Sequence, residues 1–364
     1  MVLKFKRRAR SLLLILLCAA TVLSSTAYGV CAAEAETERK SYIRWMTFPI
    51  PEAALRKAME IDIASHPAGP QIRWVDLLAY LGAKYGGNWK KYRAADMDAL
   101  LSRLKSGENM AELTKKLKYY PFFSETYGAV LDNFIGDYQI ETEQNGQKTL
   151  QTRYGLKAFS PIAKGYSYSH YRDFGDSRSF GFQRPHQGND LLGSIGTPVT
   201  AVESGTVEAI GWNRYGGWRI GIRSFDRKRS YYYAHLRKKH PYAGGLTLGS
   251  IVKAGDVIGY LGMTGYSNKE GANNMKMPHL HFGMQVIFDE SQKEGVNQIW
   301  IDVYDIVDLL AQNRVQVRRD DATKDYFRVY DFMDLRYRDH FAPQQAAPSA
   351  PPAPGGASGG APAS

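Results

Sequence analysis

Two histidines, His279 and His281, stand two positions apart and are the residues of this chain best placed to do chemistry. Side chains of a β-strand alternate between its two faces, so both imidazoles would point from one face toward one place. His186 and Asp190 form an earlier group that can supply ligands to the same place. Histidine nitrogens and a carboxylate oxygen, three ligands in all with one position left for water, are typical of a catalytic zinc site. The spacing therefore predicts a catalytic metal centre.

A further histidine, His235, lies between these two groups in a run rich in tyrosine. The chain has only eight histidines, and six of them fall within one stretch, which favours a shared site. On the residues alone, His186, Asp190 and one member of the His279/His281 pair would bind the ion. The other member and His235 would face the substrate. A neutral imidazole there can take a proton from water, and an imidazolium can stabilise an oxyanion or protonate a leaving amine.

Short apolar runs punctuated by glycine extend from residue 155 to about residue 300 and are typical of strands joined by tight turns. They predict an antiparallel all-β catalytic domain that contains both histidine groups. Along one run, alternation would place Tyr231 and Tyr233 on the face that carries His235. The runs that carry this prediction are 198–202, 206–212, 218–223, 230–236, 251–262 and 279–287.

Helical spacing of apolar residues flanks this domain on both sides, so the whole chain is predicted to be α+β. Residues 41–145 form the first helical region, in which Pro51 marks a helix start. Residues 301–341 return to helical spacing and are predicted to form a C-terminal helical extension. Residues 342–364 contain only Ala, Pro, Gly, Ser and Gln, which cannot bury a core, so this tail is predicted to be disordered.

The first 33 residues contain five basic residues and no acidic one, and an apolar run spans residues 12–30. This arrangement is typical of a secretory signal peptide, and the apolar run is also just long enough to act as a transmembrane anchor. Either alternative exports the remainder of the chain. We therefore expect an extracellular or cell-wall associated protein, bound to a membrane only if the N-terminal segment is retained.

Both cysteines, Cys18 and Cys31, lie in this first segment. Once it is removed the chain has no thiol, which excludes a disulfide framework and a thiolate metal site and leaves histidine and carboxylate as ligands. The formal net charge is +11, or +6 without the five basic residues of the first segment. Basic and acidic residues are mixed along the chain, so the charge suits an anionic cell-wall polymer and argues against a nucleic-acid partner.

Three motifs resemble the signatures of the lysostaphin-type (LytM-like) zinc metallopeptidases: His186-x-Gly188-x-Asp190, Tyr233-Ala234-His235-Leu236 and Pro278-His279-Leu280-His281-Phe282. The resemblance covers roughly residues 155–290. It implies a small antiparallel β fold with its site in a groove, and one zinc ion held by His186, Asp190 and His281. It also implies that His235 and His279 are the catalytic pair. Members of this family cleave peptide bonds of bacterial peptidoglycan, in stems or cross-bridges.

The expected function is a zinc-dependent metalloendopeptidase that hydrolyses peptidoglycan peptides, with zinc activating water. The alternative is a catalytically silent wall-binding or cell-division/sporulation interaction module on the same fold, because the family contains members that lost ligands. All five polar positions are present here. The segment from Asn268 to Met277 is longer than is usual in the family, which leaves the groove shape and the substrate open. A further hypothesis is that the helical N-terminal region is an inhibitory segment that covers the groove.

Overall fold

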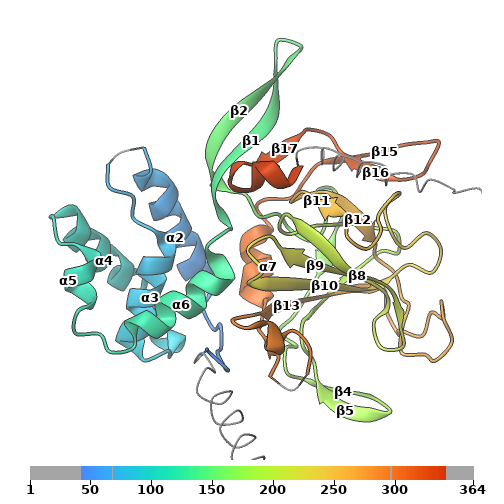
Figure 1. Ribbon diagram of the computed structural model, residues 1–364, viewed down its shortest axis with the longest axis horizontal. Coiled ribbons are helices and arrows are strands. Elements are labelled where there is room, and N and C mark those ends of the chain that lie inside the picture. The colour runs from blue at the N-terminus through green and yellow to red at the C-terminus, as the bar shows by residue number, and fades with distance from the viewer. Residues whose placement is uncertain (1–41, 68, 296, 342–364) are drawn as a thin grey trace, which may run out of the picture. The chain divides into compact units, whose positions relative to one another are not determined.

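Helices make up the first part of the described chain and strands most of the remainder, as Figure 1 shows for the computed structural model. The structure describes residues 42–67, 69–295 and 297–341. The predicted signal peptide or anchor (1–33) and the predicted disordered tail (342–364) lie outside the described residues. Within those ranges, no helix combines the length and the apolar character that crossing a membrane requires. The predicted α+β class, with helices before an antiparallel β region, is confirmed.

The first helices form where local sequence signals place them. Pro51 precedes the first of them, and the side chains of Ala54, Leu55 and Ala58, at helical spacing, are fully buried. The second ends at Gly86, whose φ of 61° lies in the left-handed region that glycine adopts without strain. The helices of this region are α2 (Glu52–Ser65), α3 (Trp74–Tyr85), α4 (Ala94–Lys105), α5 (Met110–Thr114) and α6 (Tyr120–Leu131), with the 3-10 turn η1 (Trp89–Lys91).

An eight-stranded antiparallel sheet forms the centre of the β region, with strand order β11-β8-β9-β10-β13-β6-β3 and with β14 paired to β13. Because β13 lies between β10 and β6, its residue His281 pairs with Ala234 on one side and with Asp190 on the other. Three neighbouring strands therefore bring both predicted groups to one part of the sheet. The strands are β3 (Tyr168–Ser169), β6 (Asn189–Gly193), β8 (Gly205–Asn213), β9 (Gly217–Ser224), β10 (Arg229–Leu236), β11 (Ile251–Val252), β13 (His279–Val286) and β14 (Ile299–Trp300).

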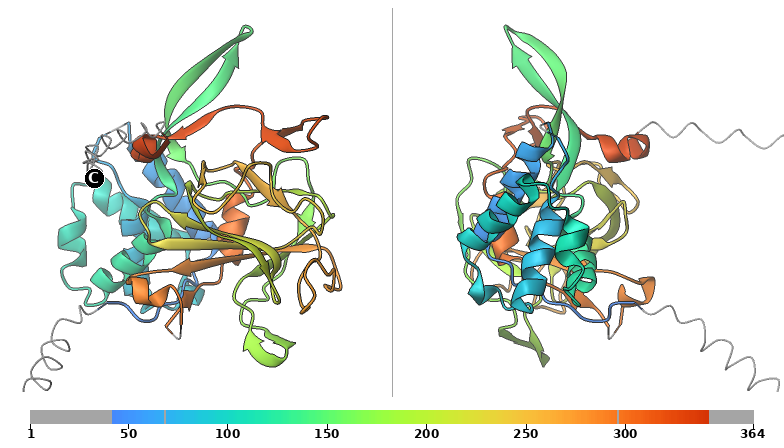
Figure 2. Two further views of the ribbon diagram at one scale, coloured as in Figure 1. Left: turned by 45° about the vertical axis from the view of Figure 1, so that its right-hand side comes forward. Right: turned by 90° about the vertical axis from the view of Figure 1, so that its left-hand side faces the viewer.

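Smaller antiparallel pairings surround this sheet. The β1–β2 and β4–β5 hairpins project from the β region in opposite directions, as the views in Figures 1 and 2 agree. The β4–β5 hairpin ends one residue before His186 and is therefore joined directly to the predicted site. The strands are β1 (Ile135–Gln144), β2 (Gln147–Leu156) and β17 (Phe332–Asp334) in one sheet; β7 (Pro198–Thr200) with β12 (Val257–Tyr260); β15 (Val317–Arg319) with β16 (Tyr326–Arg328); and β4 (Ser177–Phe180) with β5 (Phe182–Pro185).

Part of the sequence predicted to be helical forms strands instead. The prediction for 301–341 is wrong beyond α7 (Tyr304–Leu310), because β15, β16, β17 and the 3-10 segment η3 (Leu335–Phe341) follow it. At the other end, β1 occupies the last part of the range predicted as helical, 41–145. The physical reason is pairing between distant segments: β17 pairs with β1, and Phe332 of β17 is buried in the core. Such long-range contacts outweigh weak local spacing.

The helical and β regions share one continuous hydrophobic core, and the described residues from Arg44 onward belong to one compact unit. Arg229, the first residue of β10, is fully buried where the two regions meet. Its guanidinium donates to the carbonyl oxygen of Ala129 in α6 at 2.6 Å. It also donates to the carboxylates of Glu203, at 2.8 and 2.9 Å, and Asp226, at 2.7 Å. Because unpairing a buried charge is costly, this junction makes the helices an integral part of the fold.

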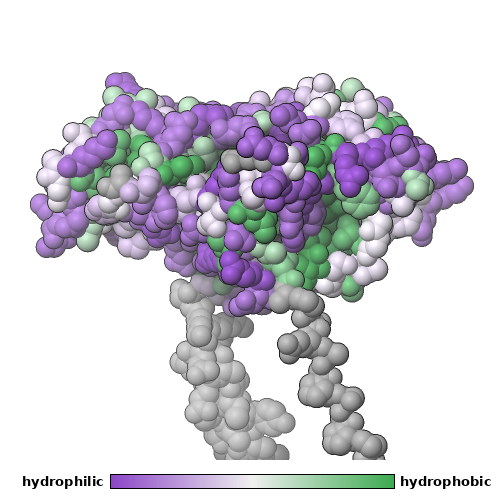
Figure 3. All heavy atoms as spheres, turned by 90° about the horizontal axis from the view of Figure 1, so that it is seen from above, coloured by the Kyte–Doolittle hydropathy of each residue, from purple (hydrophilic) through white to green (hydrophobic). Residues whose placement is uncertain are grey.

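The surface is mixed in character. Hydrophilic residues cover most of the face seen from above Figure 1, and hydrophobic residues form smaller areas between them (Figure 3). The sequence contains 47 basic and 36 acidic residues, so the positive net charge is a modest excess of basic over acidic residues. Attraction to an anionic polymer would therefore depend on the overall charge of the protein.

Candidate functional site

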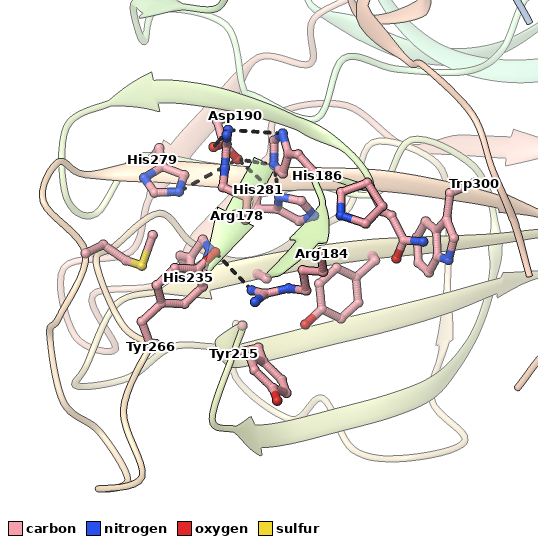
Figure 4. Close-up of a pocket in the computed structure, with 16 residues that line it drawn as sticks. Arg178, Arg184, His186, Asp190, Tyr215, His235, Tyr266, His279, His281 and Trp300 are labelled. Atoms are coloured by element: carbon pink, nitrogen blue, oxygen red, sulfur yellow. Dashed lines mark hydrogen bonds and ion pairs between the residues drawn. The ribbon is translucent and has the colours of Figure 1, made fainter. Parts of the chain in front are cut away.

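The side chains of His186, Asp190 and His281 meet at one point beside the central sheet (Figure 4). Nε2 of His186 lies 2.8 Å from Nδ1 of His281 and 3.1 Å from Oδ1 of Asp190. Nδ1 of His281 lies 3.1 Å from the same carboxylate oxygen. Zinc binds such donors at about 2.0–2.2 Å, so one ion can touch donors that are less than about 4 Å apart. The three residues can therefore hold a divalent ion, with a coordination position left open.

Asp173 and Arg178 hold His186 from behind, and the sequence analysis assigned neither residue to the site. Nδ1 of His186 lies 3.0 Å from the backbone carbonyl oxygen of Asp173 and 3.3 Å from its Oδ2. Nη2 of Arg178 donates to Oδ2 of Asp173 at 3.0 Å and lies 3.4 Å from Oδ2 of Asp190. An acceptor on the far nitrogen fixes the tautomer and the orientation of a ligand histidine. His186 therefore presents Nε2 toward the other two candidates.

The charges of this cluster stabilise one another. Burial would lower the pKa of His186, but the hydrogen bonds with Asp173 and Asp190 outweigh burial and raise the pKa to about 9. Burial would raise the pKa of Asp190, but the hydrogen bonds with His186 and His281 hold it far below its ordinary value. Burial lowers the pKa of His281. An arriving cation would therefore replace the proton of His186 as the partner of the carboxylates.

Gly188 is required between His186 and Asp190 because the chain passes directly against the His281 ring. A Cβ atom on Gly188 would lie 2.7 Å from Cε1 and Nε2 of His281 and 2.7 Å from the carbonyl oxygen of Phe282. Ordinary contacts begin near 3.4 Å. Glycine therefore lets the turn before β6 approach β13 closely enough for the three candidates to converge.

His235 faces the same cleft from an irregular point of β10. The register between β10 and β9 shifts after Tyr233, and His235 has a φ of 60°, in the left-handed region. A bulge of this kind re-aims a side chain. The predicted alternation is therefore wrong here: Tyr231 and Tyr233 are fully buried in the core, whereas Tyr232 lines the cleft together with His235.

His235 and His279 form a second pair beside the first three residues, with ring centres 4.7 Å apart. Nδ1 of His235 lies 2.7 Å from the carbonyl oxygen of Thr264, and Nδ1 of His279 lies 2.8 Å from that of Met277. Because a carbonyl oxygen only accepts, Nδ1 carries the proton of each neutral ring, and Nε2 is left as an acceptor.

These free nitrogens lie at the edge of the candidate metal site. Nε2 of His279 is buried, has no hydrogen-bond partner in the described part of the chain, and lies 3.8 Å from Oδ1 of Asp190. Burial lowers the pKa of His235 far below its ordinary value, and His279 and His281 act in the same direction. The His235 ring is therefore neutral at neutral pH, and can accept a proton.

All five predicted site residues line one cleft with a volume of about 350 Å³. Met275, from the segment 268–277 expected to influence the groove, forms part of its wall. No described residue of helices α2 to α6 lines the cleft, so these lining residues do not support the hypothesis of an inhibitory helical segment over the groove, and inhibition stays a prediction. The other lining residues are Arg178, Arg184, Pro185, Gln187, Tyr215, Gly216, Tyr232, Ala234, Tyr266 and Trp300.

The remaining histidines lie outside the cleft. His170 packs behind it, where its ring nitrogens contact Oδ1 of Asn189 at 2.6 Å and Oδ1 of Asp308 at 2.9 Å. Nδ2 of Asn189 in turn donates to Oδ1 of Asp173 at 3.1 Å. His170 therefore supports the loop that holds His186. The structure places His66, His240 and His340 away from the site.

Comparison with known proteins gives matches over the β region. The sequence model of peptidase family M23 matches residues 184–297, a stretch that contains all five predicted site residues. An L-Ala–D-Glu endopeptidase from Bacillus subtilis is 44% identical over 124 residues, which are 34% of this chain and 36% of that protein. The glycyl-glycine endopeptidase ALE-1 from Staphylococcus capitis is 33% identical over 138 residues, which are 37% of this chain and 33% of that protein.

The chain thus spans about a third of the length of these curated relatives. Among solved structures, the catalytic domain of lysostaphin from Staphylococcus simulans is 36% identical, and the match covers 34% of this chain and 85% of that chain with a TM-score of 0.28. The family predicted from the three motifs is confirmed by the match to residues 184–297. Residues 184–297 of the chain are therefore a peptidase family M23 domain.

Proposed function

We propose that the β region is a zinc-dependent endopeptidase that hydrolyses peptide bonds of bacterial peptidoglycan. The convergence of His186 Nε2, Asp190 Oδ1 and His281 Nδ1, at separations of 2.8 to 3.1 Å, carries the proposal. The match of residues 184–297 to a peptidase family supports hydrolysis. The names of two relatives describe cleavage at L-Ala–D-Glu and glycyl-glycine bonds. The family that the three motifs resemble cleaves peptide bonds of peptidoglycan, in stems or cross-bridges.

His186, Asp190 and His281 would hold one zinc ion. Zinc at such a site polarises a peptide carbonyl and lowers the pKa of water. The protein supplies the orientation: Asp173 fixes the His186 ring through Nδ1, and the turn at Gly188 brings His186 and Asp190 against His281. Because these ligands are already held in position, they need not rearrange during the reaction. Such preorganisation is the main source of electrostatic catalysis.

His235 and His279 would move the proton. Because Nδ1 of each ring is committed to a backbone carbonyl, Nε2 can accept the proton lost by the attacking water and return it to the leaving amine. While it holds that proton, the ring can stabilise the negative charge on the reacting carbonyl oxygen. The low pKa of His235 keeps that ring neutral, and so ready to accept, before the reaction begins.

Release of free amino groups from purified peptidoglycan tests the function. His281→Ala removes a ligand, and we expect both bound zinc and hydrolysis to be lost. His279→Ala removes only a proton acceptor, so zinc should remain while hydrolysis falls by about 10²- to 10⁴-fold. His340→Ala, an exposed histidine outside the cleft, is the control and should change neither. Full hydrolysis by His281→Ala would contradict the mechanism, and zinc-loaded wild-type protein that binds peptidoglycan without cleaving it would indicate a silent wall-binding module.

Export to the cell wall is part of the proposal. The basic and apolar order of residues 1–33 supports it, and the positive net charge suits contact with an anionic wall polymer. We expect the protein in the extracellular or wall fraction, or in the membrane fraction if the N-terminal segment is retained. Cell fractionation with and without residues 1–33 distinguishes these locations, and accumulation of the full chain in the cytoplasm would contradict export.

A further inference from the structure

An arginine in the cleft has no carboxylate partner within the described chain. Arg184, on β5, lines the cleft, and Nη2 of its guanidinium donates to the hydroxyl of Tyr266 at 2.9 Å. Nη1 is buried and has no hydrogen-bond partner among the described residues. A buried donor of a charged group that lacks an acceptor is unfavourable. Its position in a substrate cleft indicates that a ligand supplies the acceptor.

The placement of Arg184 on the hairpin is unfavourable for a second reason. β4 and β5 pair in a register that sets Arg178 directly opposite Arg184. Like charges at directly opposed positions of neighbouring strands destabilise a hairpin. Arg178 is neutralised by the carboxylates of Asp173 and Asp190, whereas the hydrogen bond of Arg184 goes to a neutral hydroxyl. Of these two opposed arginines, Arg184 is therefore the one without a carboxylate partner among the described residues.

Two tyrosines orient this guanidinium. Its central carbon lies 4.6 Å from the ring centre of Tyr215 and 5.1 Å from that of Tyr266. The ring of Tyr266 is in turn 6.1 Å from the ring of His235, so Arg184 is one aromatic side chain away from the proposed proton acceptor. Figure 4 shows Arg184 directed into the cleft, with His186, Asp190 and His281 on one side of it and Tyr215 on the other. Aromatic contacts and one hydrogen bond therefore hold the cation where substrate would pass.

We propose that Arg184 determines substrate specificity by binding a carboxylate close to the peptide bond that is cleaved, so that the substrate is an acidic peptide. A guanidinium presents its N–H groups in a planar fork that matches the two oxygens of a carboxylate. A carboxylate ligand supplies the acceptor that Nη1 of Arg184 lacks. It also gives Arg184 a negatively charged partner, as Asp173 does for Arg178. The inference rests on the proposed function, because it names the substrate of the same cleft.

This chemistry separates the two kinds of peptide that occur in peptidoglycan. A stem peptide with D-Glu after L-Ala offers a carboxylate beside the peptide bond, whereas a run of glycines offers no side-chain charge. A cation at Arg184 gives no advantage to a glycine peptide and attracts the acidic one. The substrate class of this cleft is therefore the acidic stem peptide.

Two peptides that differ only in this carboxylate test the proposal. Both contain the L-Ala–D-Glu bond, and in the second the free carboxyl group of D-Glu is amidated. With the zinc-loaded protein, we expect kcat/KM for the acidic peptide to exceed that for the amide by about ten- to a hundredfold. Arg184→Gln should abolish this ratio by slowing cleavage of the acidic peptide alone. Arg184→Lys keeps the charge without the fork and should retain part of the ratio, which preserves the comparison if Arg184→Gln does not fold.

Arg214→Gln is the matched control. The Arg214 guanidinium also lies over the Tyr215 ring, at 4.6 Å, but the side chain is exposed and does not line the cleft. Its replacement should leave the ratio of the two peptides unchanged. A loss of the ratio in Arg214→Gln equal to that in Arg184→Gln would assign the effect to general surface charge and would overturn the proposal.

The outcomes distinguish this inference from the proposed function. Equal cleavage of both peptides by the wild-type protein would refute the role of Arg184 and leave the hydrolase intact. An equal fall for both peptides in Arg184→Gln would also refute it, because that result indicates stabilisation of the reacting carbonyl. If neither peptide is cleaved and purified peptidoglycan releases no amino groups, the hydrolase proposal fails. Calorimetric titration of the two peptides then tests the role of Arg184. The inference is then supported if the wild-type protein binds the acidic peptide more tightly than the amidated one and Arg184→Gln does not. Equal binding of the two peptides by the wild-type protein overturns it.

Discussion

Replacing Gly188 by alanine is the most direct test of how the candidate ligands are held together. The new Cβ atom would lie 2.7 Å from the His281 ring and from the carbonyl oxygen of Phe282, whereas ordinary contacts begin near 3.4 Å. The turn or strand β13 must therefore move by about 0.7 Å, the difference between these two distances. Zinc–ligand distances tolerate about 0.2 Å. Because the oxygen of Phe282 belongs to the backbone, a change of rotamer at His281 cannot absorb the whole displacement.

We expect Gly188→Ala to lower zinc affinity by at least the 10- to 100-fold that misorienting a ligand causes, and to destabilise the fold by about 1–3 kcal/mol as an overpacked site does. Competition with a chelator measures the affinity, and urea unfolding measures the stability. Gly155→Ala is the control, because Gly155 is also buried but its added Cβ would have its nearest neighbours at 3.9 Å. Wild-type zinc affinity in Gly188→Ala would refute the assignment of His281 as a ligand that this turn positions.

Three further changes test the surroundings of the site. Asp173→Asn keeps the shape but removes the charge beside His186, and we expect zinc affinity to fall about 10- to 100-fold in a chelator competition, so an unchanged affinity would count against its positioning role. Arg229→Met leaves the buried carboxylate of Glu203 and the partly exposed one of Asp226 without their cation and should cost about 3–5 kcal/mol in urea unfolding, whereas a loss near zero would show that the junction contributes little. A fragment of residues 150–310 lacks the helical part of the core and should melt at a lower temperature than residues 34–364 without gaining activity; a faster fragment would support the inhibition hypothesis.

The residues that gather in the cleft were predictable because their signals are local. His279 and His281 share a strand face through period-two alternation, and the short spacing of His186 and Asp190 keeps both near the start of β6. The β region was predictable for a similar reason, because glycine and short apolar runs report turns and strands without any long-range information. The order in which the strands pair, which brings these groups together, was not predicted. The full set of zinc ligands came only from the resemblance to a known family.

The parts that could not be predicted depend on contacts between distant segments. Asp173 and Arg178 belong to no spacing pattern, and only the folded loop places them behind His186. The bulge at His235 follows from the packing of β10 against β9, so strict alternation assigned the neighbouring tyrosines to the wrong faces. β17 forms because it pairs with β1, a strand far away in the sequence. The apolar residues of this segment therefore pack as part of a sheet and not as one face of a helix.

β13 connects the two halves of the site and explains how the helical region can act on it. His279 and His281 both line the cleft from this strand, so a slip of one residue in its pairing would turn both away together. The same strand pairs Val286 with Arg229 at its far end, where the buried guanidinium is tied to α6. We therefore expect the helices to stabilise the register of β10 against β13. Damage at this junction should reduce zinc content and hydrolysis in proportion to the folded fraction, and should leave the preference between the acidic and the amidated peptide unchanged.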